Sequence, residues 1–347
     1  MKFTKEIINT IKEFIIEKIS EHPNNIASAV IKHFGITKPT VSKYINELIE
    51  EGILERTGKG RYPKYQLKTV TVEIKKLISN SLEEDVIWRD EVSSRIENLP
   101  KNIKSICQYG FTEMVNNVID HSEGVNLNIT VLINAKNVKF IIEDDGIGIF
   151  NKIQKDLKLE NPKYSILELA KGKFTSDPEN HTGEGIFFTS RMFDSFVIIS
   201  RELRFLGNTD SGDWLFEDCN FDSSGTVVFM EISKTSKLDM VKIFNEYADP
   251  NKVPGFHRTV IPVKLMEYEG ESLLSRSQAK RLIHRFDHFL EVILDFEGVK
   301  FIGQAFADQI FRVFVNAHPN VNIIALNAID EIQNMINYVK SNKPKSS

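Results

Sequence analysis

Residues 138–149 read VKFIIEDDGIGI, and this stretch decides the fold of the middle of the chain. The apolar residues 138–142 predict a β-strand, which forms a hairpin with residues 127–133 around a turn at 134–137. The strand leads directly into Asp144, which is followed by Gly146 and Gly148. A carboxylate at a strand end can accept a hydrogen bond from the amino group of a base, and glycines let a base approach the backbone because they have no Cβ. The stretch therefore predicts one edge of a nucleotide site.

A helix is predicted over residues 101–121, just upstream of the hairpin. Residues three or four positions apart share one face of a helix. The apolar stripe consists of Ile103, Cys107, Phe111, Met114 and Val118. The polar stripe beside it consists of Glu113, Asn117, Asp120 and His121. Polar residues that border the buried face favour a pocket wall over a solvated surface, although an amphipathic helix with an incidental polar edge would explain this helix taken alone.

Two further motifs follow the hairpin. Residues 181–188 read HTGEGIFF, in which Gly183 and Gly185 open a helix and leave backbone N–H groups free for phosphate oxygens. Residues 224–229 begin a strand with a Gly-Thr pair that includes Thr226. Each motif alone is a weak signal, because short glycine patterns are common by chance. The ordered set is far more specific.

This ordered set resembles the GHKL (Bergerat-fold) family, which includes gyrase, histidine kinases, the MutL mismatch-repair proteins and the bacterial anti-sigma-factor kinases. The resemblance covers about residues 103–232 and implies an α/β sandwich domain at 71–236. It implies ATP and Mg²⁺ as cofactors, with Glu113 as the general base and Asn117 holding Mg²⁺. Asp144 would accept from the adenine amino group. The other implied ATP contacts are Asp120, His121, Gly146, Gly148, Lys173, Thr182, Gly183, Gly185 and Thr226.

The resemblance also implies a mobile lid over the phosphates, at about residues 151–182, that contains Lys171, Lys173 and Phe174. Two features depart from the family pattern. His181 stands where the glycine-rich motif often has another glycine, and no lysine from a following domain can be assigned to the site. We therefore expect hydrolysis to be slow.

The first 68 residues form a separate block. Apolar spacing predicts helices at 3–19 and 26–34 and a third helix after Thr37, and then a hairpin with its turn at 57–60. Residues 37–67 read TKPTVSKYINELIEEGILERTGKGRYPKYQL and resemble a winged helix-turn-helix. In that motif the second helix of the pair enters the DNA major groove and the wing reaches the backbone or the minor groove.

The resemblance implies that this block binds double-stranded DNA. Residues 1–68 carry 12 Lys and Arg against 8 Asp and Glu, whereas the whole chain has 44 against 48. Ordinary surface variation would also explain this asymmetry, and winged helices also serve as protein-interaction modules. The positions expected to face outward and contact DNA are Lys38, Thr40, Ser42, Lys43, Tyr44, Arg56, Lys59 and Arg61.

Residues 250–343 alternate strands and helices, which predicts a small α/β domain. Residues 294–314 read LDFEGVKFIGQAFADQIFRVF and resemble STAS-type domains, the fold of anti-sigma-factor antagonists. In those partners a serine that follows a strand and turn is phosphorylated. Residues 303–305 are Gly-Gln-Ala and carry no hydroxyl, so self-phosphorylation at this place is disfavoured. Ser275 and Ser277 are expected to cap a helix.

The composition is that of a soluble globular protein, with 41% hydrophobic and 27% charged residues. No apolar run is long enough to cross a membrane, and the N-terminus lacks the apolar centre of a secretion signal, so we expect a cytoplasmic protein without a membrane partner. Two cysteines, Cys107 and Cys219, cannot form a disulfide framework or a cysteine metal site.

The sequence thus predicts a multidomain α+β protein with a winged helix, a GHKL-type ATP-binding domain and a STAS-like domain. Its expected function is that of an ATP-binding, slowly hydrolysing switch in transcription or signalling, whose nucleotide state controls DNA binding. The alternative is a protein-serine kinase of the anti-sigma-factor type that acts in trans on a STAS or sigma-factor partner. A scaffold that binds ATP statically is the third hypothesis. A homodimer or a STAS-mediated protein contact is also expected.

Overall fold

A computed structural model describes residues 4–57, 63–79, 81–174, 183–207, 216–218, 224–248, 255–267 and 272–341. Three positions of the expected DNA and ATP sites, Lys59, Arg61 and Thr182, lie outside these described residues. His181 and Cys219 lie outside them as well.

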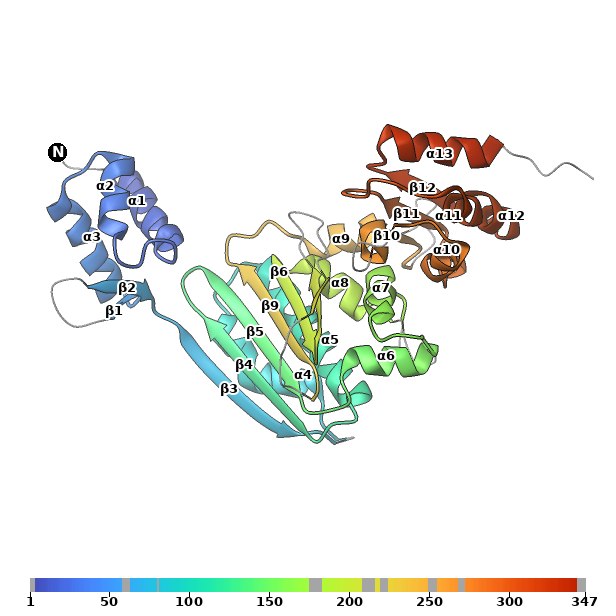
Figure 1. The fold of residues 1–347 in the computed structure, drawn as a ribbon. Coiled ribbons are helices and arrows are strands. Elements are labelled where there is room, and N and C mark those ends of the chain that lie inside the picture. The colour runs from blue at the N-terminus through green and yellow to red at the C-terminus, as the bar shows by residue number, and fades with distance from the viewer. Residues whose placement is uncertain are drawn as a thin grey trace, which may run out of the picture.

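The N-terminal unit, residues 4–67, is a bundle of helices followed by an antiparallel strand pair (Figure 1). Its elements are α1 (Lys5–Lys18), α2 (Ile26–Phe34), α3 (Lys38–Glu50), β1 (Leu54–Thr57) and β2 (Lys64–Leu67). The Thr4 hydroxyl accepts from the Ile7 amide and caps α1, while Gly35 ends α2 at a φ of 64°. The unit has a hydrophobic core of its own, separate from the core of the remaining chain.

Only residues 68 and 69 separate β2 from the next strand, β3. In Figure 1 the N-terminal unit continues directly into this strand, and it also contacts the turn at residues 134–137, where Lys136 Nζ donates to the Glu17 carbonyl at 3.5 Å. β3 is the edge strand of the central sheet, which is antiparallel throughout and has the order β3-β4-β5-β9-β6-β7-β8. These strands are β3 (Val70–Leu77), β4 (Asn126–Ile133), β5 (Asn137–Asp144), β6 (Ser195–Ser200), β7 (Leu203–Gly207), β8 (Phe216–Asp218) and β9 (Val227–Ser233).

Helices cover one face of this sheet. They are α4 (Glu84–Ile87), η1 (Trp88–Val92), η2 (Ser93–Ile96), α5 (Lys101–His121), α6 (Ile149–Leu157), α7 (Tyr164–Lys171), α8 (Gly185–Met192) and α9 (Met240–Glu246). The predicted apolar stripe of α5 is confirmed, because all five of its residues are buried. The Phe111 ring lies 5.8 Å from the Phe140 ring of β5, which fixes α5 against the middle of the sheet.

The C-terminal part contains a parallel sheet of order β10-β11-β12 with helices between the strands. Its elements are β10 (Arg258–Pro262), η3 (Val263–Met266), α10 (Arg276–Ile283), η5 (Phe286–His288), β11 (Glu291–Asp295), α11 (Gln304–Asp308), η6 (Gln309–Phe314), α12 (Val315–Ala317), β12 (Asn322–Leu326) and α13 (Asp330–Ser341). Of the two predicted caps, Ser275 makes a full capping box with Gln278 at the start of α10.

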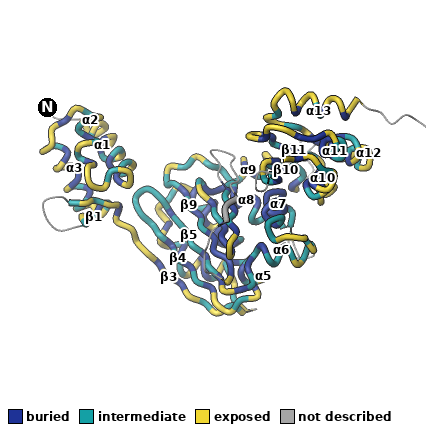
Figure 2. Tube along the Cα trace, viewed as in Figure 1, coloured by how far each residue is buried: buried dark blue, intermediate teal, exposed yellow. Residues whose placement is uncertain are grey.

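The cores of the central and C-terminal parts are continuous. The ring of Phe256, just before β10, lies 4.3 Å from the ring of Phe187 on α8 and 5.4 Å from that of Phe289. Figure 2 shows buried segments running through the central sheet and its helices, whereas α13 is largely exposed. Among the described residues, no helix combines the length and the apolar character needed to cross a bilayer. The fold is mixed α+β with several sheets, as predicted.

Candidate functional site

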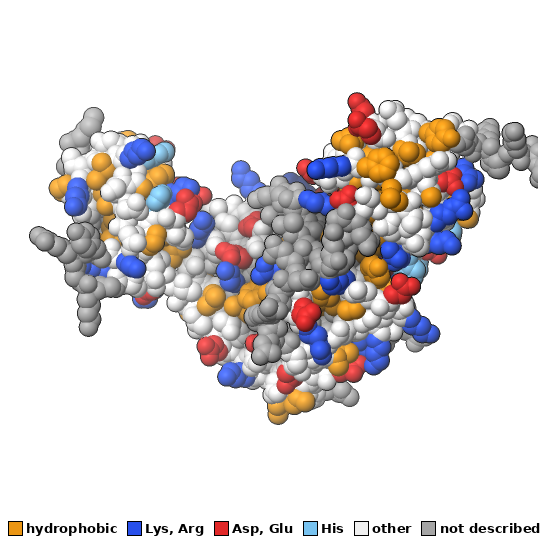
Figure 3. All heavy atoms as spheres, in the orientation of Figure 1, with side chains coloured by type: hydrophobic (Ala, Val, Ile, Leu, Met, Phe, Trp, Pro, Cys, Tyr) orange, Lys and Arg blue, Asp and Glu red, His pale blue; other side chains and the backbone are white. Residues whose placement is uncertain are grey.

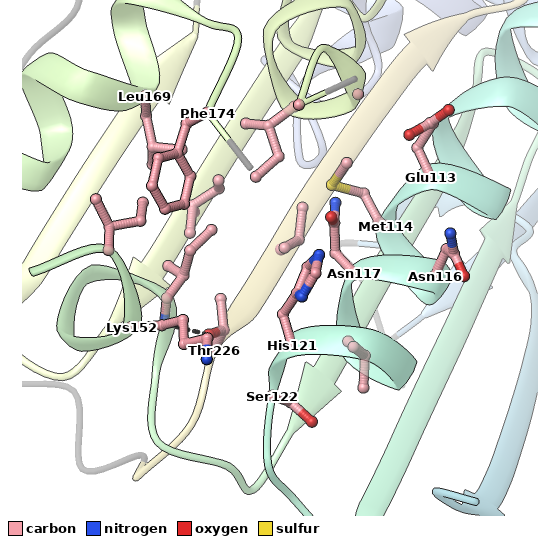
Figure 4. Close-up of a pocket in the computed structure, with 18 of the residues that line it drawn as sticks. Glu113, Met114, Asn116, Asn117, His121, Ser122, Lys152, Leu169, Phe174 and Thr226 are labelled. Atoms are coloured by element: carbon pink, nitrogen blue, oxygen red, sulfur yellow. Dashed lines mark hydrogen bonds between the residues drawn. The ribbon is translucent and has the colours of Figure 1, made fainter. Parts of the chain in front are cut away.

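A cavity of about 290 Å³ opens between α5, the central sheet and the helices α6, α7 and α8 (Figure 4). Small-molecule sites are typically enclosed hollows of about this size or larger, lined by apolar groups with a few polar ones. The structure brings together at this cavity eight residues that the sequence singled out from four separate segments. They are Glu113, Asn117, His121, Asp144, Gly148, Gly183, Gly185 and Thr226.

Asp144 lies at the end of β5, lines the cavity and is only 4% exposed. Its Oδ1 accepts from the Gly146 amide at 2.8 Å, and its own amide donates to the Thr226 carbonyl at 3.0 Å. The Thr226 hydroxyl in turn accepts from the Ile149 amide at 3.0 Å. Burial raises the pKa of Asp144 to about 6, although hydrogen bonds from Gly146 and Thr226 act in the opposite direction. The carboxylate is therefore held rigidly, with acceptor capacity left for a ligand.

The loop after Asp144 requires glycine at Gly148. Its φ of +84° lies in the region that favours glycine, and a Cβ there would overlap the Ser200 hydroxyl. Gly146 does not line the cavity, but its amide holds the Asp144 carboxylate. The sequence predicted both glycines beside the base, and of the two only Gly148 lines the cavity.

Glu113, Asn117 and His121 of α5 line the cavity from successive turns, and Asn116 lines it beside them (Figure 4). The Asn117 Nδ2 atom is buried and has no hydrogen-bond partner among the described residues. An unpaired amide inside a protein is costly, and its nitrogen and oxygen can exchange places by rotation. This amide therefore has one polar atom available for a ligand in the cavity.

Glu113 lies directly against the glycine-rich loop where both line the cavity. A Cβ at Gly185 would overlap the Glu113 carboxylate, so the loop approaches the acid as closely as glycine permits. Gly183, at the other end of the same loop, packs against the backbone of Phe174. Acid, amide and glycine backbone thus occupy one end of the cavity, and Asp144 and Thr226 occupy the other.

Besides Gly146, two expected ATP contacts do not line the cavity. Asp120 is exposed, because α5 presents Asn117 and His121 to the cavity and turns Asp120 to a neighbouring side. Lys173 points to the C-terminal part, where its Nζ donates to the His288 carbonyl at 2.9 Å and lies 5.1 Å from the centre of the Phe289 ring. Burial lowers the pKa of Lys173.

The described part of the expected lid, residues 151–174, contains most of α6 and all of α7, which pack against each other and against neighbouring elements. Lys171 is fully buried and pairs with Glu168, with 2.6 Å between Lys171 Nζ and Glu168 Oε1. It is therefore a structural ion pair and not a group directed at phosphate.

Several lining residues were not predicted from the sequence. Lys152 of α6 faces the cavity, with its Nζ 3.4 Å from Glu123 Oε1 and 3.7 Å from Asp156 Oδ1. Its place one helical turn after Gly148 was the available signal. Leu169 and Gly172 form an apolar wall opposite α5 together with Phe174, which the sequence placed in the expected lid. No local pattern marked Leu169 and Gly172, because this wall is positioned by contacts with the C-terminal part.

The structure exposes some of the residues expected to contact DNA and buries others. Lys38, Ser42, Lys43 and Arg56 are exposed, and Thr40 is half-buried. Tyr44 is the exception: it is 4% exposed and lies in the core of the N-terminal unit, so the expectation of an outward side chain was wrong. It shares its helical face with Val41 and Leu48, which are both buried. Figure 3 shows Lys and Arg side chains spread over the visible face of this unit.

Comparison with known proteins identifies the C-terminal part. The family model described as a STAS-like domain of unknown function (DUF4325) matches residues 278–333. The match runs from within α10 to the start of α13 and includes β11 and β12. The C-terminal part therefore contains a STAS-like domain. No curated protein matches the chain.

Proposed function

We propose that the cavity binds ATP with Mg²⁺ and that the chain is a regulator whose nucleotide state controls DNA binding by residues 1–68. The observation that carries this proposal is the meeting of Glu113, Asn117 and Asp144 with the glycine loop at one cavity. These groups are the ones that the GHKL resemblance assigns to ATP. The central sheet with α5 and α8 on one face supports the same assignment.

The two ends of the cavity suit the two ends of the nucleotide. Asp144 would accept from the adenine amino group, with Thr226 and Gly148 beside the base. Backbone amides near Gly183 and Gly185 would donate to phosphate oxygens at the start of α8, where the helix dipole favours negative charge.

The cavity also fits a metal that arrives with the phosphates. Among the described residues, no three His, Cys, Asp or Glu side chains gather to hold a metal by themselves. The Asn117 amide, buried with one unpaired atom, would supply one oxygen ligand to Mg²⁺, a cation that usually keeps waters and phosphate oxygens as its other ligands. Bound Mg²⁺ would neutralise phosphate charge.

Glu113 would act on the water that attacks the terminal phosphate. A carboxylate beside the phosphate loop can accept a proton from that water as its oxygen bonds to phosphorus and the bond to ADP breaks. The fate of the phosphate separates the switch from a kinase acting in trans. With radiolabelled ATP, release of free phosphate supports the switch, whereas label on a protein partner supports the kinase.

The N-terminal unit supports the DNA part of the proposal. Three helices followed by a strand pair match the order of a winged helix, and Lys38, Ser42 and Lys43 are exposed near the start of α3. Basic and hydroxyl side chains there can contact DNA phosphates and base edges.

The direct test is titration of the full-length chain with Mg-ATP by calorimetry. Asp144→Asn should abolish or strongly weaken binding, because the amide replaces an acceptor oxygen with a donor. Glu143→Gln is the matched control, since it makes the same kind of change on the preceding residue, which does not line the cavity. If wild type and Asp144→Asn bind Mg-ATP with equal affinity, the assignment of the ATP site to this cavity is wrong. If the DNA affinity is the same with and without Mg-ATP, the chain is not a nucleotide-controlled switch.

A further inference from the structure

The segment 168–174 has two sides. Leu169, Gly172 and Phe174 line the cavity. The polar groups of the same segment are bonded to the C-terminal part. Lys171 Nζ donates to the carbonyls of Arg281 and His284 at 3.2 and 2.9 Å. The cavity wall is therefore held from behind by another part of the chain.

Arg285 is the centre of this contact and belongs to the STAS-like region. Its side chain is 8% exposed, and its Nη1 lies 2.9 Å from Glu168 Oε2. Its Nη2 donates to the Gly172 carbonyl at 3.1 Å and also to the Lys173 carbonyl. One guanidinium thus binds a carboxylate and two carbonyls of the segment 168–174, a geometry that the planar fork of arginine permits and lysine does not.

The backbone on both sides of the contact is unusual. Lys173 has a φ of 53° and Arg285 has a φ of 64°, and residues other than glycine rarely adopt this region of backbone conformation. Arg285 binds the Gly172 and Lys173 carbonyls at this turn, so the contact fixes the course of residues 172–174.

The same residues lead to the phosphate end of the cavity. Gly183 packs against the backbone of Phe174, so a shift of Phe174 would move the glycine-rich loop. We propose that Arg285 is a positioning residue for the cavity: through Glu168, Gly172 and Lys173, the STAS-like domain sets the position of the apolar wall and, through Phe174, that of the glycine-rich loop. This inference rests on the proposed ATP site and adds the coupling of that site to the STAS-like domain.

The test compares two ligands on the full-length chain. Mg-ATP binding is measured by calorimetry, and adenosine binding by ligand-observed NMR, for wild type, Arg285→Ala and Arg285→Lys. Arg312→Ala is the matched control, because Arg312 pairs with Asp308 in the same STAS-like region, on a helix remote in sequence from Arg285. The melting temperature of each variant is recorded.

Arg285→Ala should weaken Mg-ATP binding about tenfold, the factor expected for one charge-assisted hydrogen bond, and change adenosine binding by less than about twofold. Arg285→Lys should give an intermediate loss for Mg-ATP, since it keeps the charge beside Glu168. Arg312→Ala should affect neither ligand. If Arg285→Ala does not fold, the comparison rests on Arg285→Lys with the same two ligands.

Three outcomes would overturn the inference while leaving the proposed function in place. These are unchanged Mg-ATP affinity in both Arg285 variants, equal losses for Mg-ATP and adenosine, and an equal loss in Arg312→Ala. The last two would indicate general loosening of the fold. Absence of Mg-ATP binding by the wild type would overturn the proposed function, and this inference with it.

Discussion

Gly185, the first residue of α8, lies directly against the carboxylate of Glu113 on α5. A Cβ at Gly185 would overlap Glu113 Oε2, so the loop and the acid can be this close only if residue 185 is glycine. The proposed phosphate loop and the proposed general base are thereby placed side by side.

We predict that Gly185→Ala abolishes ATP hydrolysis and weakens Mg-ATP binding, because either the acid or the loop must move. The double variant Gly185→Ala with Glu113→Ala removes the overlap and should bind Mg-ATP as Glu113→Ala does. This is a double-mutant cycle, in which coupling shows as non-additivity. Additive effects on affinity would contradict a steric origin.

We predict that Asp144→Asn stabilises the ligand-free protein at neutral pH. The folded pKa of about 6 is above the ordinary value of 3.8, so the protonated form favours folding. That contribution is fully present below about pH 4 and is lost as the pH rises through about 6. Asparagine is neutral throughout, so its advantage should be roughly 1–3 kcal/mol at pH 7.5 and vanish near pH 4. Urea unfolding at both pH values measures this, and an advantage independent of pH would argue against a buried, charged Asp144.

We predict that Lys171→Met destabilises the fold strongly. Burial lowers the pKa of Lys171, while the Glu168 carboxylate opposes that shift. Burial alone would raise the pKa of Glu168, but Lys171, His284 and Arg285 bring it down to about 2. Breaking a buried ion pair typically costs about 3–5 kcal/mol. Lys155→Met on α6, where the lysine is exposed, should have a much smaller effect on urea unfolding.

We predict that Lys43→Glu weakens DNA binding and makes the dependence of log affinity on log salt shallower, by about one for each phosphate that the protein no longer neutralises. Lys43 is 71% exposed on α3, and its Nζ lies 3.8 Å from Glu47 Oε1. Lys18→Glu makes the same charge change on α1 and should affect binding less. If neither salt nor Lys43→Glu changes the DNA affinity, the N-terminal unit is a protein-interaction module and not a DNA-binding one.

The sequence predicted those features that are encoded locally. The buried stripe of α5, the hairpin that ends at Asp144 and the helix that begins at Gly185 all follow from periodicity and glycine positions. Tyr44 was misplaced although its spacing from Val41 and Leu48 indicated a buried face. Lys171 and Lys173 were misassigned for a different reason: their partners in the C-terminal part lie more than a hundred positions later, and no local pattern reveals them.

The connection between β2 and β3 limits how any signal can reach the N-terminal unit. Two residues extend over about 7 Å at most, so this unit cannot travel away from the sheet edge, and the hydrogen bond from Lys136 to the Glu17 carbonyl also holds it beside the turn between β4 and β5. Displacement of β3 would be carried directly into the orientation of α3. Inserting a flexible Gly-Ser spacer after Leu67 would therefore separate the two functions: ATP and DNA would each still bind, but neither would alter the affinity for the other.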